Sequence, residues 1–304
     1  MVSRSSLPIA LGPIRSALFA PAVRPERFPR ALASPADAVI IDLEDSVALS
    51  HKEEARSMVR EALPGLVRDK PLLLRVNPLS SPFAEEDLAL AAETGFSGVL
   101  LPKAETAEEI KAAHGLLTAK EKAAGLTPGG LGLIPMIETP LGLENSLAML
   151  SQPLDGALGK PRPVTAAFGA LDFCAGLGVE LIEDGAVLAY PRARLAVACR
   201  AAGLEGPLDS PFSLRIKDTE ALRVDALAAK GLGFQGKLCI HPLQAETVNQ
   251  VFSPSAREVE LALKIIQAFE LAEAQGRAAL EVEGRMVDYP LVIQARRTVE
   301  RSRL

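Results

Sequence analysis

Short apolar runs recur along most of the chain, and segments with helical periodicity separate them. Several runs are continuous and not alternating, which is typical of parallel strands that are covered on both faces. The predicted strands span residues 16–20, 38–43, 72–76, 98–101, 132–137, 164–168, 208–212 and 236–240. The predicted helices span residues 25–33, 52–63, 85–94, 107–124, 141–150, 192–202, 219–230 and 244–251.

Eight strands that alternate with eight helices predict an α/β fold, the (β/α)8 TIM barrel. A doubly wound open sheet is the alternative, but the number of units favours closure. The seventh strand is the weakest part of this prediction, because it is short and contains Pro211. We therefore expect a barrel over residues 1–252.

The pattern changes after Phe252, where residues 253–304 exceed what an eight-unit barrel needs. Ser253 or Ser255 can cap the start of an amphipathic helix over about residues 256–275. A short hairpin turning at Glu283-Gly284 and a last helix after Pro290 follow. This C-terminal helical extension caps the barrel, forms a dimer contact or acts as a lid.

Composition narrows the class of protein. A net charge of −5 gives no sign of attraction to nucleic acid or to a membrane surface. No stretch approaches 18 uninterrupted apolar residues, and the N-terminus lacks the apolar core of a signal peptide. Three widely spaced cysteines in apolar surroundings indicate buried thiols of a reducing compartment. We expect a cytoplasmic enzyme with neither a nucleic-acid nor a membrane partner.

Glu138 and Asp172 each follow an apolar run directly. In a barrel of parallel strands both would reach the same edge, the C-terminal one, where active sites lie. A buried carboxylate is unfavourable unless it is paired or bound to a metal. A helix cap or a salt-bridged acid is about as probable for either residue alone, but two acids on neighbouring strand ends favour a metal. Oxygen ligands suit Mg²⁺, with Mn²⁺ as a possible substitute, better than zinc.

Other polar residues follow predicted strands. Arg75 suits a carboxylate or a developing enolate, although it could instead be a buried partner of Asp42 or Glu44. The cluster Asp42, Glu44 and Asp45 is too dense to consist of metal ligands only, so hydrogen bonds to metal-bound water are expected. His241 is expected to contact substrate, and Asn77, Lys103 and Glu105 also follow strands.

An arginine-rich run follows the first predicted strand and includes Phe19, Arg24 and Arg30. It forms either a solvated helix face or a phosphate clamp for a nucleotide-like group. The glycine-rich GLGFQG segment precedes the eighth strand and does not follow one, which disfavours a nicotinamide cofactor.

Many short motifs occur together in one order: RSALFAPA, DLEDSVALSHKEEAR, LLRVNP, LLPKAE, PMIETPLGLEN, AAFGALDF, GFQGKLCIHPLQ, FSPSAREVELA and EGRMVDYP. From Arg15 to about Arg297 the chain resembles the citrate lyase β-subunit-like family of the HpcH/HpaI aldolase/citrate lyase superfamily. That family includes malyl-CoA, citramalyl-CoA and citryl-CoA lyases. The resemblance implies a Mg²⁺-dependent barrel that cleaves or forms a carbon–carbon bond next to a CoA thioester, with a 2-oxo acid as the other partner.

The resemblance also implies roles for single residues. Glu138 and Asp172 match metal ligands, and Arg75 matches the arginine that binds substrate. Asp288 matches an acid that reaches a neighbouring subunit's site, which implies a homo-oligomer, a trimer or hexamer, with the lid acting in trans. Positions matching coenzyme A or substrate contacts are Phe19, Arg24, Arg30, Ile240 and His241. Two alternatives remain open: the β subunit of a citrate lyase complex acting on an acyl-carrier-protein thioester, and a metal-dependent aldolase acting on free 2-oxo acids.

Overall fold

The computed structural model describes residues 11–156, 162–182 and 185–303. Contacts within the chain divide it into two compact units, Met1–Asn249 and Gln250–Leu304. Each unit is described by itself.

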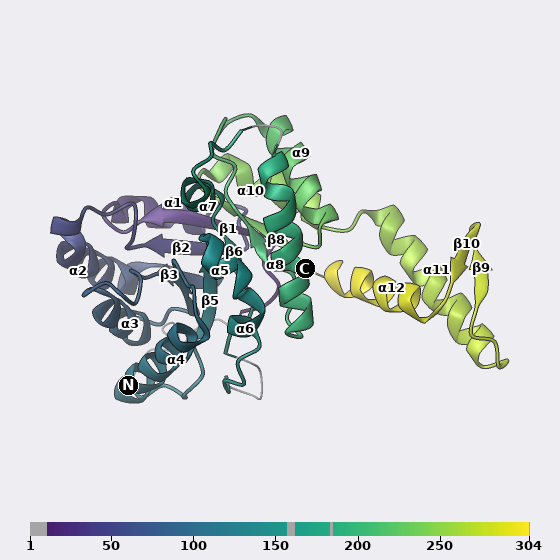
Figure 1. Ribbon diagram of the computed structural model, residues 1–304, viewed down its shortest axis with the longest axis horizontal. Helices are drawn as coiled ribbons and strands as arrows, with labels where there is room; N and C mark the ends of the chain where they lie inside the picture. Colours follow the sequence, from purple (N-terminus) through teal and green to yellow (C-terminus); the bar gives the residue numbers. More distant parts are fainter. Residues whose placement is uncertain (1–10, 157–161, 183–184, 304) are drawn as a thin grey trace. The chain divides into compact units, whose positions relative to one another are not determined.

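The first unit is a closed barrel of eight parallel strands in sequence order, in which the last strand pairs with the first (Figure 1). The TIM barrel expected from the sequence is therefore confirmed. The two shortest strands have two residues each, and the seventh is one of them. The strands are β1 (Ser16–Pro21), β2 (Ala38–Asp42), β3 (Leu72–Arg75), β4 (Gly98–Leu101), β5 (Gly132–Ile137), β6 (Ala167–Phe168), β7 (Leu208–Asp209) and β8 (Gly236–Cys239).

Helices surround the strands and differ from the sequence prediction in several places (Figure 1). The segment expected as one helix over residues 25–33 is a 3-10 turn over residues 25–27 followed by a short α-helix over residues 28–32. The segment expected as one helix over residues 141–150 is two short helices that meet at Asn145. The structure adds α7, which was not among the eight expected helices. The helical segments of this unit are η2 (Pro25–Arg27), α1 (Phe28–Leu32), η3 (Leu49–His51), α2 (Lys52–Ala62), η4 (Leu63–Gly65), α3 (Ala84–Glu93), α4 (Ala107–Ala123), α5 (Pro140–Glu144), α6 (Ser146–Leu150), α7 (Ala170–Leu177), η6 (Ala186–Leu188), α8 (Ala189–Ala201), α9 (Thr219–Gly231) and α10 (Pro242–Phe252).

The barrel interior is a closed apolar core, so the site must lie at an end of the barrel. Alternate strand residues form this core, and their strand neighbours pack outward against the helices. In β2, for example, Ala38 and Ile40 belong to the inner cluster, and Val39 and Ile41 are equally buried but outside it. Burial on both faces explains why the strands are continuous apolar runs in the sequence.

A buried ion network ties β7 and β8 to α8 and α9. Asp209 accepts hydrogen bonds from Arg192 Nε and Nη2 at 3.0 and 2.9 Å and also pairs with Lys237. Asp225 pairs with Arg192 at 2.7 Å and with Lys237 at 2.6 Å. Burial of these charges is tolerated because every member has an oppositely charged partner.

The second unit has its own small core. It contains α11 (Ala256–Glu273), the antiparallel pair β9 (Leu280–Val282) and β10 (Arg285–Val287), and α12 (Tyr289–Arg301). Ser255 caps α11 reciprocally with Glu258, which confirms one of the two predicted caps. The predicted hairpin turn is also confirmed, since Glu283 and Gly284 both have positive φ, at 49° and 76°.

The three cysteines are free and buried, as the sequence predicted. Burial raises the pKa of the Cys199 and Cys239 thiols to about 12, so neither is a reactive thiolate near neutral pH. Across residues 11–156, 162–182 and 185–303, no helix combines the length and apolar character that crossing a membrane requires.

The buried network predicts a large stability loss on replacing Asp209. Asp209→Ala would leave the charges of Arg192 and Lys237 buried with only Asp225, and we expect the unfolding free energy to fall by about 3–5 kcal/mol. Urea denaturation followed by circular dichroism measures this change. Glu220→Ala, which removes an exposed pair with Arg223 on α9, is the matched control and should change stability little. Equal stability of the two variants would contradict the structural role of the network.

Candidate active site

A cavity of about 710 Å³ opens at the C-terminal ends of the barrel strands. Its wall includes one or more residues from the end of nearly every strand, which is where active sites of this fold lie. Polar residues converge there from β1 to β8. The wall contains Phe19, Arg27, Arg30, Asp42, Asp45, Ser46, Arg75, Met136, Glu138, Gly169, Asp172, Ser210, Ile240 and His241, among others.

Asp42 and Arg75 form a buried two-point ion pair at the floor of this site. They are register partners on β2 and β3, and Arg75 Nε and Nη2 donate to the two Asp42 oxygens at 2.6 and 2.8 Å. Burial by itself would raise the Asp42 pKa, but Arg75 outweighs it, so that the pKa lies below its ordinary value. Asp42, Glu44 and Asp45 raise the Arg75 pKa above its ordinary value, so Arg75 is always charged.

Arg75 still has donors for a substrate. Its guanidinium lies over the Phe19 ring, 4.9 Å from the ring centroid, which fixes the plane of the fork. Among the described residues, three of its five N–H groups donate in hydrogen bonds, two to Asp42 and one to Asp45 at 3.4 Å. The sequence left open whether Arg75 binds substrate or serves as a buried acid partner, and the geometry permits both.

Glu44 is buried between two cations. Its Oε1 accepts a hydrogen bond from Lys103 Nζ at 2.6 Å, and its Oε2 lies 3.0 Å from Arg75 Nη1 without making a hydrogen bond. Burial raises the Glu44 pKa, and the positive charges of Arg75 and Lys103 offset this only in part. Glu44 therefore lies between Arg75 and Lys103 and pairs with both.

Glu138 follows β5 and is almost fully buried, 2% exposed. Its Oε1 accepts the main-chain N–H of Lys103 at 2.8 Å, and no donor among the described residues reaches Oε2. Burial first, and then the negative charge of Glu44, raise the Glu138 pKa to about 8. Its second oxygen accepts no hydrogen bond from the described residues, so the negative charge of this buried carboxylate is poorly compensated. A bound cation would neutralise it.

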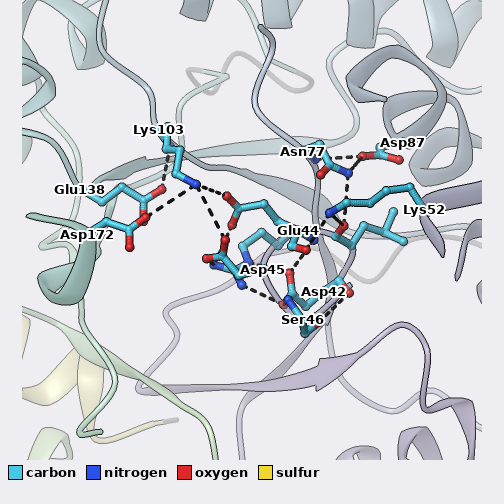
Figure 2. A network of polar contacts seen from close by, with 12 residues as sticks. Asp42, Glu44, Asp45, Ser46, Lys52, Asn77, Asp87, Lys103, Glu138 and Asp172 are labelled. Carbon is cyan, nitrogen blue, oxygen red and sulfur yellow. Dashed lines mark hydrogen bonds and ion pairs between the residues drawn. The ribbon is translucent and has the colours of Figure 1, made fainter. Parts of the chain in front are cut away.

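Asp172 is the second oxygen ligand that the sequence predicts. It lies in the first turn of α7, its negative charge helps to raise the Glu138 pKa, and Figure 2 shows that both acids contact Lys103. Its side chain is 41% exposed and faces Lys103 Nζ at 3.7 Å. Both acids line the cavity, so a cation between them would also reach a substrate.

The local charge balance fits a divalent cation. Five acids gather at the site, namely Asp42, Glu44, Asp45, Glu138 and Asp172. Within the described chain, the cationic side chains in contact with them are Arg75 and Lys103, which leaves a net charge of −3 when all seven groups are ionised. The described residues contain no group of three or more His, Cys, Asp or Glu side chains that could hold a metal by themselves. Two carboxylates with the remaining positions open to water and substrate are what Mg²⁺ typically uses.

The close approach of Gly169 to Glu138 explains the small residue before α7. A Cβ at Gly169 would lie 2.5 Å from Glu138 Oε2 and 2.6 Å from its Cβ. The backbone therefore forms one wall of the Glu138 carboxylate, and only glycine leaves room for it.

The predicted coenzyme A and substrate residues are only partly brought together. Phe19, Arg30, Ile240 and His241 line the cavity, and Arg24 does not. Arg24 instead pairs with Glu26 at 2.5 Å on the exposed start of η2. His241 Nδ1 accepts the main-chain N–H of Leu243 at 3.2 Å, which leaves Nε2 for a ligand.

Asp288 lies in the second unit, where it caps α12 by accepting the main-chain N–H of Leu291 at 3.3 Å. Asparagine or aspartate is the usual residue for such a cap. Its assignment as a catalytic acid that acts on a neighbouring subunit stays a prediction.

Three features of the site were not predicted from the sequence. Arg27 lines the cavity with Arg30, and the i, i+3 spacing of these two residues could have indicated a shared face. Gly169 and the contacts of Lys103 gave no local signal, because both depend on how separate strand ends meet.

The comparisons with known proteins agree with this geometry. The family model for HpcH/HpaI aldolase/citrate lyase matches residues 15–242. The citrate lyase subunit beta of Escherichia coli is 34% identical over 95% of this chain and 93% of its own. The L-malyl-CoA/beta-methylmalyl-CoA lyase of Cereibacter sphaeroides is 33% identical over 96% and 95%.

Solved structures are similar along nearly the whole chain. The protein CitE from Mycobacterium tuberculosis, in complex with magnesium, acetoacetate and coenzyme A, is 30% identical with a TM-score of 0.74, covering 99% of this chain and 100% of that one. A citrate lyase from Burkholderia xenovorans has a TM-score of 0.80 over 97% and 93% at 16% identity, which supports the fold alone.

The contact between Gly169 and Glu138 predicts that Gly169→Ala displaces the carboxylate. We expect Mg²⁺ affinity to fall on the order of tenfold, as when the support of a metal ligand is disturbed. Isothermal titration calorimetry measures this. Gly115→Ala on α4, where an added Cβ meets nothing within 4 Å, is the control. Wild-type affinity in Gly169→Ala would show that Glu138 does not hold the cation.

Proposed function

This chain belongs to the HpcH/HpaI aldolase/citrate lyase family, and from that premise we propose that it is a Mg²⁺-dependent carbon–carbon lyase of CoA esters. Its substrate class is a β-hydroxyacyl-CoA such as malyl-, citramalyl- or citryl-CoA, cleaved to acetyl-CoA or a related acyl-CoA and a 2-oxo acid. The observation that carries the proposal is the incomplete Glu138 carboxylate beside Asp172, in a cavity that also presents Arg75.

Mg²⁺ would be held by Glu138 and Asp172, and when bound it supplies Lewis-acid polarisation of the oxygens of the acyl group. The remaining tasks belong to the chain. Arg75, fixed by Asp42 and stacked on Phe19, lines the cavity. Donors placed in advance cost no reorganisation when negative charge develops.

The reaction is a retro-Claisen cleavage. The bond between the α carbon of the thioester and the hydroxyl-bearing carbon breaks, the hydroxyl group loses its proton to a base, and its carbon becomes the carbonyl of the 2-oxo acid. The bonding electrons pass to the thioester as an enolate, whose carbon then takes a proton. Arg75 stabilises the enolate charge. The reverse condensation uses the same groups.

Arg27 and Arg30 are the phosphate-binding candidates for coenzyme A. Both are exposed residues at the cavity wall, on the segment after β1. Their charge compensates the acids deeper in the site and attracts an anionic substrate. Phe19, Ile240 and His241 are proposed to contact the substrate, and Arg24, paired with Glu26 outside the wall, would act only from the rim.

We propose that Asp288 is the proton donor to the enolate carbon and that it acts in trans, in a homo-oligomer such as a trimer or hexamer. The support is the family resemblance of the GRMVD segment together with a second unit that has its own core.

We also infer a reducing, cytoplasmic location, which the free buried cysteines support.

A second function is favoured by the similarity to citrate lyase subunit beta, at 34% identity. A β subunit of a citrate lyase complex would act on an acyl-carrier-protein thioester and depend on partner subunits. An aldolase acting on free 2-oxo acids would have no use for Arg27 and Arg30.

The proposal predicts cleavage by the purified chain without partners. At least one of malyl-, citramalyl- and citryl-CoA should be cleaved in the presence of Mg²⁺, EDTA should abolish turnover, and added Mg²⁺ should restore it. Release of the 2-oxo acid, trapped by phenylhydrazine, measures the rate. Turnover of an acyl-carrier-protein thioester alone would favour the citrate lyase subunit, and equal turnover of free hydroxy acids would favour the aldolase.

A lid that acts in trans predicts complementation between two inactive variants. Asp288→Asn keeps the α12 cap, and Glu138→Gln removes a metal ligand without changing side-chain size. Each should be nearly inactive alone, whereas co-expressed chains that mix randomly in a closed ring should regain about a quarter of wild-type activity. Sites that use their own chain's Asp288 would show no recovery, and full activity of Asp288→Asn would exclude its catalytic role.

A further inference from the structure

Lys103 has an unusual backbone conformation at the position where β4 leads into the site. Its φ is 52°, in the left-handed region that non-glycine residues seldom adopt. Such conformations persist where the surroundings hold them, often at functional sites. Both ends of the residue are engaged, because its main-chain N–H donates to Glu138 Oε1 at 2.8 Å and its ammonium group to Glu44 Oε1 at 2.6 Å.

The segment that carries the acceptor, Glu44, is itself held by hydrogen bonds, some of which Figure 2 shows. Lys52 Nζ is buried and donates to the main-chain oxygens of Leu43 and Glu44, both at 2.7 Å. Asn77 Nδ2 also donates to the Leu43 oxygen, at 3.2 Å. The segment carrying Glu44 is therefore fixed from behind, and Glu44 in turn fixes the ammonium group.

The ammonium group also faces the acids of the candidate metal site. It lies 3.7 Å from Asp172 Oδ2 and 3.8 Å from Asp45 Oδ1. In the part of the chain that the structure describes, no other cationic side chain contacts Asp172. Among the described residues, Lys103 is thus the one cationic side chain in contact with Asp172, and its main-chain N–H also orients Glu138.

We propose that Lys103 is a positioning residue that serves as the internal counter-ion of the metal-free site and releases Asp172 when a divalent cation binds. The inference rests on the proposed function, because it requires the cation at Glu138 and Asp172. The ammonium group and the cation compete for one set of negative charges. The main-chain N–H keeps Glu138 in place throughout, since it has no need to move.

The proposal makes a directional prediction for metal affinity. Removing the ammonium group removes a competing positive charge, so Lys103→Met and Lys103→Gly should bind Mg²⁺ about three- to tenfold more tightly than wild type. Glycine also accepts the positive φ without strain, and so separates the loss of charge from the backbone conformation. Lys103→Arg keeps the charge and should bind as wild type does.

The experiment is isothermal titration calorimetry of the full chain with Mg²⁺ at pH 8.5, with thermal melting to verify folding. Lys111→Met on α4 is the matched control, since Lys111 is an exposed lysine that lies 3.8 Å from Glu108. If Lys103 had only a structural role, its loss would leave affinity unchanged or lower it, and either result in Lys103→Met and Lys103→Gly overturns the inference. Tighter binding by Lys103→Arg overturns it too. Absence of Mg²⁺ binding by the wild type would instead refute the proposed metal site itself.

Discussion

The pairing of Asp42 with Arg75 is the interaction on which the site depends. Because the two residues are register partners on adjacent strands, the pairing of β2 with β3 brings them side by side. The ion pair then sets the guanidinium plane, against which Phe19 stacks and Glu44 is held. The positive charge of Arg75 also lowers the Glu138 pKa, and so it offsets part of the repulsion that Glu44 and Asp172 exert on this carboxylate.

The fold could be predicted from the sequence because a parallel barrel leaves a direct trace, namely apolar strands buried on both faces. Prediction was less exact where that trace is weak. Strands β6 and β7 have only two residues each, so most of the apolar run that predicted each strand lies outside the sheet. Helix α7 is mostly apolar even at its exposed positions, which include Leu171 and Leu177, so its sequence has no polar face that helical periodicity could reveal.

The candidate site divides in the same way. Glu138, Asp172 and Arg75 were predictable because position at a strand end determines where a side chain emerges in this fold. The role of Lys103 was not, since it follows from a left-handed backbone and from acids that are 59 and 69 residues away in the sequence. Arg24 was predicted from the family resemblance alone, whereas the cavity wall contains Arg27 in its place. The proposed part of Asp288 came from the resemblance of the GRMVD segment, since this residue follows no barrel strand.

The missing side chain at Gly169 links the evolution of two positions. Any residue larger than glycine there competes for the volume of the Glu138 carboxylate, so the two sites cannot vary independently. A lineage that lost the acid would be free to fill the space, and one that filled the space first would select for a shorter acid. Glycine at 169 and glutamate at 138 should therefore be inherited as a unit, and the presence of both in a distant homologue is a sharper mark of a retained metal site than either residue alone.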